Sequence, residues 1–188
     1  LGNNHPQVEI FPVAYIIILY GGIYFLPLNI FDIWSKGEDG LVEWIQFILY
    51  FFSFACSLVV TWHRRNLGKQ FFFWLLITAL CFYIAGEEIS WAERITSIGI
   101  ESIRQINAQG ETNFHNIPIF QNYLHFSFII TGLFLGWIGW KNWPQIEAFP
   151  RRSLSLYFLI VSLFYTYFDL SWITLGERIR NDQEAIEI

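Results

Sequence analysis

The residues best suited to chemistry in this chain are acidic side chains in short polar segments. Glu87 and Glu88 are adjacent in the segment 86–94, which ends an apolar run. Two neighbouring carboxylates at a hydrocarbon boundary are costly unless they are paired or protonated. Arg94 lies two helical turns after Glu87, so we expect an ion pair between these two side chains. The alternative is an acidic pair with one raised pKa, which moves a proton or holds a metal ion.

A second polar segment, residues 107–116, combines amide, carboxylate and imidazole groups and contains no basic residue. Carboxylates at the membrane boundary need hydrogen-bond donors, and this segment supplies them, so we expect Glu87 or Glu88 to contact its part 109–116. A set of carboxylates with an imidazole could exchange protons with a substrate. The candidate catalytic residues are Glu87, Glu88, Arg94, Glu111 and His115.

The same segments contain ligand types that suit a divalent metal ion. Glu88, His115 and His125 supply the carboxylate and imidazole donors that zinc, iron or manganese accept. The two histidines are ten residues apart, which is not the spacing of a tight metal motif. The cofactor is therefore unknown and a divalent metal stays an alternative. Asp169 is a further candidate, because an acid inside a membrane span is functional by default.

The composition places these residues in a membrane protein. Of the 188 residues 54% are hydrophobic, 20% are aromatic and 14% are charged, against roughly 25% charged in a typical soluble domain. This excludes a soluble globular protein, a disordered chain and a nucleic-acid-binding protein. Most of the apolar runs approach the length of about 20 residues that crosses a bilayer as a helix. The predicted spans are residues 11–30, 41–62, 71–97, 124–140 and 154–175.

We therefore expect an all-α fold, with residues 1–188 forming a single transmembrane domain. It is a polytopic membrane bundle of five transmembrane helices plus a short outer interfacial helix. The third helix is extended through 97 because Gly86 is the only breaker between 71 and 97. Residues 98–122 form the outer loop, and the amphipathic stretch 98–106 predicts the interfacial helix.

Two smaller patterns predict helix geometry. Asp39 or Gly40 is suited to begin the second span as an N-cap, with Glu43 in the first turn at the positive end of the helix dipole. Gly132 and Gly136 form a GxxxG pattern in the fourth span. This pattern predicts close helix packing, either within the chain or between two copies of it.

The basic residues predict the orientation of the spans. Short loops rich in lysine and arginine are cytoplasmic, which places the N-terminus in the cytoplasm and the C-terminus outside. Only Glu9 and Glu147 of the 16 acidic residues then fall on the cytoplasmic side, so the outer face is strongly acidic. The basic residues of the two loops are Arg64, Arg65, Lys69, Lys141, Arg151 and Arg152.

The polar segments also form a set of motifs, EDGxxEW at 38–44, GEEISWxxR at 86–94 and QGExNxHN at 109–116. This set resembles a family of small multi-span bacterial membrane proteins known mainly as uncharacterised, over roughly residues 36–120. The resemblance implies a bacterial inner membrane, cytoplasmic or energy-converting, and it implies that these polar residues belong together. It implies no reaction. The chain departs from the family at Ala92 and Glu93, where the family has a Gly-Gln pair.

Three functions remain open. The first is a membrane protein with an acidic and histidine site at the extracytoplasmic helix ends, which binds a metal ion or protons and could be an enzyme. The second is a non-catalytic accessory subunit of a larger membrane complex, in which the polar cluster is a structural clasp. The third is a proton or cation pathway. The expected partners are the lipid bilayer and either other membrane subunits or a second copy through Gly132 and Gly136, and no nucleic acid.

The topology can be tested by cysteine labelling in intact cells. A membrane-impermeant reagent should label Ser97→Cys, on the expected outer side, and should not label Asn66→Cys in a cytoplasmic loop. Labelling of Asn66→Cys alone would show that the orientation is reversed.

Overall fold

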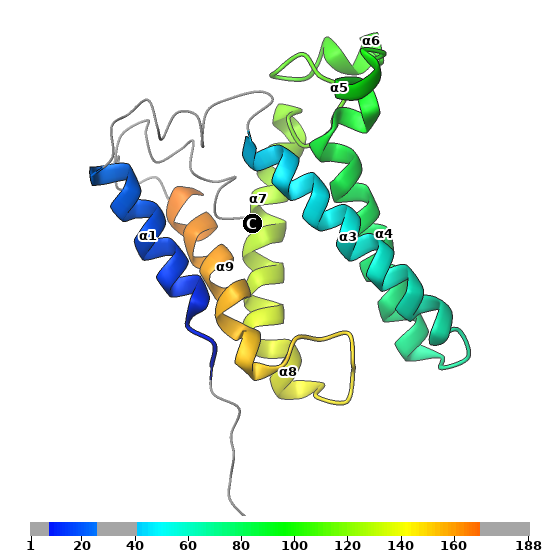
Figure 1. Ribbon diagram of the computed structural model, residues 1–188, viewed down its shortest axis with the longest axis vertical. Coiled ribbons are helices and arrows are strands. Elements are labelled where there is room, and N and C mark those ends of the chain that lie inside the picture. The colour runs from blue at the N-terminus through cyan, green and yellow to red at the C-terminus, as the bar shows by residue number, and fades with distance from the viewer. Residues whose placement is uncertain (1–7, 26–40, 170–188) are drawn as a thin grey trace, which may run out of the picture. The chain divides into compact units, whose positions relative to one another are not determined.

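The structure is a computed structural model that describes residues 8–25 and 41–169, and these residues form helices and no strand (Figure 1). Three helical segments are long and apolar enough to cross a membrane, which are Leu41–His63, Lys69–Glu88 and Pro118–Asn142. Helices α1 (Phe11–Phe25) and α9 (Ser155–Asp169) each have 15 residues in the described part. The all-α class is therefore confirmed, with three candidate spans among the described residues, and the five-span bundle stays a prediction.

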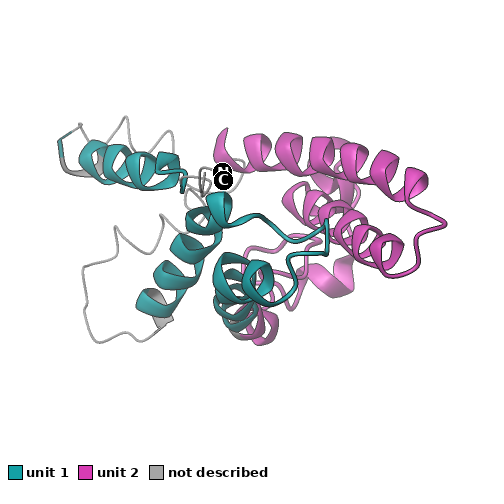
Figure 2. Cartoon of the chain, turned by 90° about the horizontal axis from the view of Figure 1, so that it is seen from below, with its two compact units in different colours: residues 1–32, 125–186 teal, residues 33–124, 187–188 magenta. Residues whose placement is uncertain are grey.

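The chain divides into two compact units, residues 1–32 with 125–186 and residues 33–124 with 187–188 (Figure 2). The candidate catalytic residues all belong to the second unit, whereas His125 belongs to the first. The predicted N-cap of the second span and the side chain of Asp169 lie outside the described residues.

The second unit is built on a hairpin of α3 (Leu41–His63) and α4 (Lys69–Glu88). Glu43 lies in the first turn of α3, as predicted. The hydroxyl groups of Thr61 and Thr78 are hydrogen-bonded across the hairpin at 2.9 Å, and the rings of Phe54 and Phe82 lie 5.2 Å apart. Hydrogen bonds and close packing of this kind hold helices together where both lipid and side chains are apolar.

The predicted single helix over 71–97 is wrong, because α4 ends at Glu88. Ser90, Trp91 and Ala92 have φ angles of 48°, 53° and 73°. Three successive residues in the left-handed region cannot continue a right-handed helix. The chain therefore leaves the axis of α4 at this left-handed turn.

After the turn, the chain forms only short helical pieces, and we call residues 89–117 the cap. The predicted interfacial helix over 98–106 is reduced to the four residues of α6. Within the predicted outer loop 98–122, the next helix already begins at Pro118, where the missing N–H of proline costs nothing. The cap contains η1 (Ser90–Ala92), α5 (Glu93–Thr96) and α6 (Glu101–Arg104).

In the first unit the predicted GxxxG pattern packs helices within the chain. The glycines lie in α7 (Pro118–Leu133) and in the π-helical turn η2 (Phe134–Ile138), which continues into α8 (Gly139–Asn142). A methyl group on Gly132 would lie 2.6 Å from the carbonyl oxygen of Phe158 in α9. A methyl group on Gly136 would lie 2.6 Å from Cγ of Leu159. The two glycines thus allow α9 to approach closely.

We expect Gly136→Ala to lower the free energy of unfolding by about 1–3 kcal/mol, because the added methyl group overpacks the contact with α9. Gly21→Ala in α1 is the matched control, since a methyl group there meets nothing within 4 Å. This control should leave stability unchanged or raise it by about 0.5–1 kcal/mol. Thermal unfolding in detergent, followed by circular dichroism, measures both, and equal melting temperatures would contradict the packing role of Gly136.

Candidate functional site

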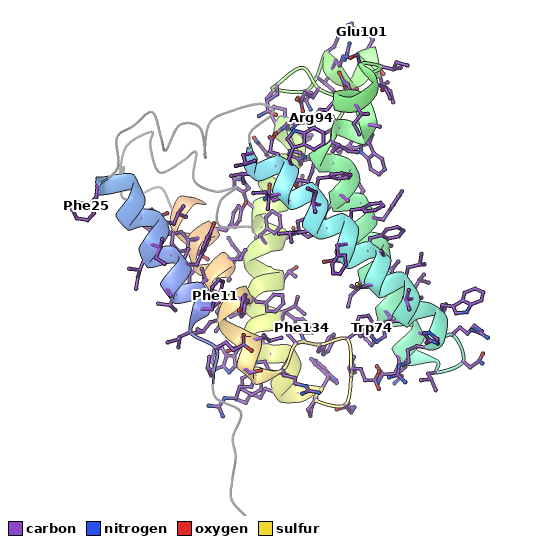
Figure 3. The ribbon with its side chains drawn as sticks, viewed as in Figure 1. Phe11, Phe25, Trp74, Arg94, Glu101 and Phe134 are labelled. Atoms are coloured by element: carbon purple, nitrogen blue, oxygen red, sulfur yellow. The ribbon has the colours of Figure 1, made fainter. Side chains whose placement is uncertain are left out.

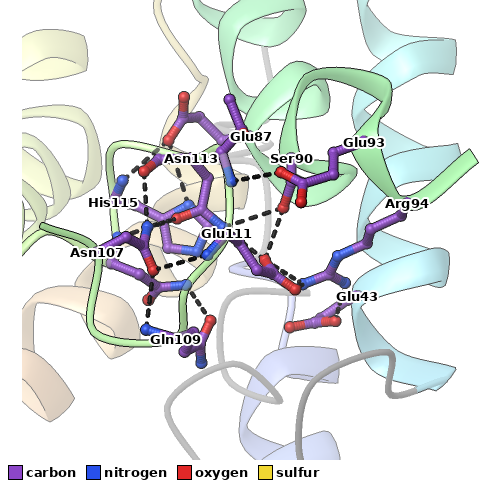
Figure 4. A network of polar contacts seen from close by, with 12 residues as sticks. Glu43, Glu87, Ser90, Glu93, Arg94, Asn107, Gln109, Glu111, Asn113 and His115 are labelled. Carbon is purple, nitrogen blue, oxygen red and sulfur yellow. Dashed lines mark hydrogen bonds and ion pairs between the residues drawn. The ribbon is translucent and has the colours of Figure 1, made fainter. Parts of the chain in front are cut away.

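A network of polar side chains joins the end of the hairpin to the cap (Figure 4). Its acidic members come from the first turn of α3, from the last turn of α4 and from the cap itself. The network therefore connects segments that are far apart in the sequence. The four glutamates are Glu43, Glu87, Glu93 and Glu111.

Arg94 is the centre of the network. Its Nη1 donates to Oε2 of Glu43, and its Nη2 donates to Oε1 and Oε2 of Glu111 at 3.1 Å and 2.9 Å. The Arg94 side chain is only 5% exposed. Burial alone would lower the pKa of Arg94, but the hydrogen bonds and charges of the two glutamates outweigh burial and raise that pKa. The guanidinium is therefore a permanent cation shared between two carboxylates.

The expected ion pair between Arg94 and Glu87 is wrong. The prediction assumed a continuous helix, in which residues i and i+7 share a face. The left-handed turn instead directs Arg94 toward Glu43 and Glu111.

Glu87 is satisfied by neutral donors and by a histidine. The indole nitrogen of Trp91 donates to its Oε1 at 2.5 Å. The backbone N–H groups of Phe114 and His115 donate to its Oε2 at 2.7 Å and 2.9 Å, and Nδ1 of His115 lies 3.3 Å from the same oxygen. The predicted contact between the acidic pair and the segment 107–116 is thus confirmed for Glu87.

Two buried amides and a serine organise the cap around Glu111. Ser90 Oγ and Asn113 Nδ2 both donate to Oε2 of Glu111, at 2.6 Å and 2.8 Å. Asn107 Nδ2 donates to Oδ1 of Asn113 at 2.7 Å, and Asn107 Oδ1 accepts the backbone N–H of Gln109 at 2.8 Å. Ser90 and Asn113 are fully buried. A buried polar group is tolerated only when it is hydrogen-bonded, and here each one has partners.

A second ion pair closes the outer part of the cap, and its base, Arg104, is not among the predicted site residues. Arg104 Nε donates to Oε1 of Glu93 at 2.7 Å, and the backbone N–H of Thr112 donates to Oε2 at 2.7 Å. Burial acts to raise the pKa of Glu93, but the hydrogen bonds from Arg104 and Thr112 outweigh it and lower that pKa. The excess of acids over bases in the predicted cluster was the signal that a further base belonged to it.

The left-handed turn is explained by the position of the Trp91 ring. A methyl group on Gly86 would lie 2.9 Å from Cε3 and Cζ3 of Trp91, so the indole packs directly over this glycine. The rings of Phe82 and Tyr83 pack edge-on against the indole at 6.1 Å and 5.7 Å. Left-handed backbone costs about 1–2 kcal/mol per residue. The hydrogen bonds and ring contacts of the turn offset this strain.

Two further predicted ligands, Glu88 and His125, each have contacts of their own. Glu88 is half-buried and has an interaction of its own. His125, in the first unit, packs edge-on against Tyr165 with ring centroids 5.0 Å apart. Within residues 8–25 and 41–169, no group of three or more His, Cys, Asp or Glu side chains is placed to hold a metal ion.

The Glu87–His115 pair is the part of the network that could exchange a proton. An ionised carboxylate only accepts hydrogen bonds, so a neutral His115 ring facing Glu87 carries its proton on Nδ1. The other nitrogen, Nε2, then has a lone pair. The His115 side chain is 33% exposed, whereas that of Glu87 is 4% exposed. The pair therefore combines a buried acceptor with a partly accessible base.

No family model, curated protein or solved structure matches the chain. We therefore infer the function from the geometry of the network.

We expect Ala92→Gly to raise the free energy of unfolding by about 1 kcal/mol, because glycine adopts the left-handed backbone at φ 73° without the steric cost of a Cβ atom. Ala79→Gly is the control, since Ala79 is exposed in the interior of α4. That substitution should lower stability by about 1 kcal/mol. Both are measured by thermal unfolding in detergent. A similar loss of stability in both variants would mean that residue 92 is not left-handed.

Proposed function

We propose that the chain is a non-catalytic membrane protein, of the accessory-subunit type, in which the polar network is a structural clasp. The clasp holds the cap against the end of the α3–α4 hairpin. The observation that carries this proposal is the bridge made by Arg94, which pairs at once with Glu43 of α3 and Glu111 of the cap. A catalytic carboxylate must be able to reach a substrate, whereas these two are occupied by the chain's own cation.

The remaining carboxylates of the network support the same function. Glu87 accepts three N–H donors from Trp91 and from the backbone of the cap, and Glu93 accepts Arg104 and a backbone N–H. Preorganised donors that saturate a carboxylate leave little capacity for a ligand. The network is thus suited to fix the fold of the cap.

We further propose that the cap lies on the extracytoplasmic side of a bacterial inner membrane, with the N-terminus cytoplasmic and the C-terminus extracytoplasmic. Within the second unit, the turn 64–68 lies at the opposite end of the hairpin from the cap (Figure 1). This turn contains Arg64 and Arg65, and the guanidinium of Arg65 lies 4.8 Å from the ring centroid of Trp62. Basic residues and tryptophan together are typical of a cytoplasmic membrane interface.

A second candidate function is a proton- or metal-binding site at His115. The observation that favours it is the partly exposed ring of His115 beside the buried carboxylate of Glu87. A histidine that donates one ring N–H to a carboxylate is oriented to bind a metal ion or a proton through its other nitrogen. If this site binds a metal ion, the stability of the chain should depend on that ion. The clasp predicts no such dependence.

The clasp predicts that Glu111→Gln lowers the free energy of unfolding by about 3–5 kcal/mol, because it removes one partner of a buried charge. Glu101→Gln is the matched control on the same cap. Glu101 is exposed and accepts a hydrogen bond from Gln105, so this change should stay within about 0.5 kcal/mol of the wild type.

Melting curves of the purified wild type and both variants, with and without a chelator, test the two candidates. A Glu111→Gln variant that melts at or above the wild-type temperature would contradict the clasp. A wild type that melts lower in chelator, with His115→Ala insensitive to chelator, would favour the metal site instead.

A further inference from the structure

The cap has the opposite polarity to a segment folded in water. Many of its polar side chains turn inward to the network: the Arg94 side chain is only 5% exposed, and Asn107, Asn113 and Asn116 are buried. Its aliphatic side chains turn outward, with Ile98 at 78%, Ile95 at 61% and Ile106 at 59% exposure. Single exposed apolar residues are normal, whereas four exposed isoleucines within residues 95–106 exceed that pattern and favour an interaction surface. We call Ile95, Ile98, Ile100 and Ile106 the isoleucine surface.

The exposed polar side chains of the cap lie in and beside α6 and at Thr96 and Ser97. Glu101 and Gln105 are both exposed and are hydrogen-bonded to each other at 3.2 Å. Figure 3 places Glu101 at the far edge of the cap, whereas Arg94 lies where the cap meets the hairpin. The cap therefore exposes isoleucine side chains and also has a polar edge at Glu101, although its helical pieces are too short to be amphipathic helices.

Three N–H groups of the irregular backbone beside the isoleucine surface are satisfied inside the cap. The N–H of Ile98 donates to Oγ1 of Thr96 at 3.2 Å, and that of Ile100 donates to Oγ1 of Thr112 at 2.8 Å. The N–H of Ser97 donates to the carbonyl oxygen of Glu93 at 2.7 Å. Non-helical backbone is tolerated at membrane depth only when the protein itself satisfies it.

We propose that the isoleucine surface inserts into the lipid leaflet at the cap end of the hairpin and contacts acyl chains, while the Glu101 edge stays in water. The aromatic cluster of Phe82, Tyr83 and Trp91 connects the apolar surface of α4 to the cap, and tyrosine and tryptophan favour this interfacial depth. The contact is apolar, because the cap's two arginines are paired with glutamates. Insertion is therefore as strong in zwitterionic as in anionic lipid.

Insertion of the cap goes beyond the clasp, and it would explain why the charges of the cap are paired internally. A cap that enters the boundary of the hydrocarbon region must keep its charges paired internally, because an unpaired charge there is costly. The clasp could hold the cap in water equally well, so the two proposals fail independently. Failure of the clasp appears in melting curves, and failure of insertion appears in contact with lipid.

The test uses single cysteines that carry an environment-sensitive fluorophore, in the full chain with Cys56→Ala and Cys81→Ala, in nanodiscs of zwitterionic lipid. Ile98→Cys and Ile106→Cys report on the isoleucine surface, and Glu101→Cys and Gln105→Cys are the controls at the polar edge. Ile95→Cys replaces either probe if its label lowers the melting temperature. Quenching by acyl-brominated lipid is compared with quenching by iodide in the aqueous phase.

Probes at 98 and 106 should be quenched several-fold more strongly by brominated lipid than the controls, and the controls more strongly by iodide. Exchange of the lipid for an anionic one should leave this pattern unchanged. Strong iodide quenching at 98 and 106 would overturn the proposal by placing the surface in water. Weak quenching of these probes by both agents would also overturn it, because a protein surface would then cover the isoleucines.

Discussion

The fold of the second unit depends on one requirement, which is that the buried charges at the end of the α3–α4 hairpin are neutralised. Glu43 lies in the first turn of α3 and is largely buried, so a cation beside it stabilises its charged form. Arg94 provides that cation and at the same time binds Glu111, which brings three distant segments to one point. Breaking such a group costs far more than an exposed ion pair contributes, because it leaves a charge without a partner in a low-dielectric region. The path of the chain through the cap follows from this requirement.

The left-handed turn at residues 90–92 allows Arg94 to reach and neutralise Glu43. A continuous helix would present Arg94 on the face of Glu87, on which Trp91 and backbone N–H groups already act as donors. Three left-handed residues redirect the chain so that Arg94 faces Glu43 instead. The turn is strained by itself, and its anchors are the indole that packs over Gly86 and the hydroxyl of Ser90 that donates to Glu111. Strained backbone of this kind persists only where the surroundings determine it.

The dependence of the left-handed turn on distant contacts explains which features the sequence could predict and which it could not. The apolar runs predicted α3 and the helical class, because length and hydropathy are local properties. The need of Glu87 for donors predicted its contact with the segment 107–116, because buried carboxylates are rarely left unsatisfied. The end of α4 could not be predicted, since residues 86–97 contain no helix breaker except Gly86 and the turn depends on contacts with residues 111–113. Arg104 was missed for the same reason, as its pairing with Glu93 exists only after the turn has formed.

The separation in sequence between Glu43 and its cation has a consequence for biosynthesis. Arg94 follows Glu43 by 51 residues, so at roughly 5–20 residues per second the ribosome delivers the cation about 3–10 s after the acid. Glu87 receives its donors from Phe114 and His115 later still. The hairpin must therefore enter the membrane with these acids protonated or hydrated, and it becomes a fully neutralised structure only after the cap has emerged. The nascent hairpin therefore passes through a stage in which its own fold does not yet supply these partners to the two carboxyl groups.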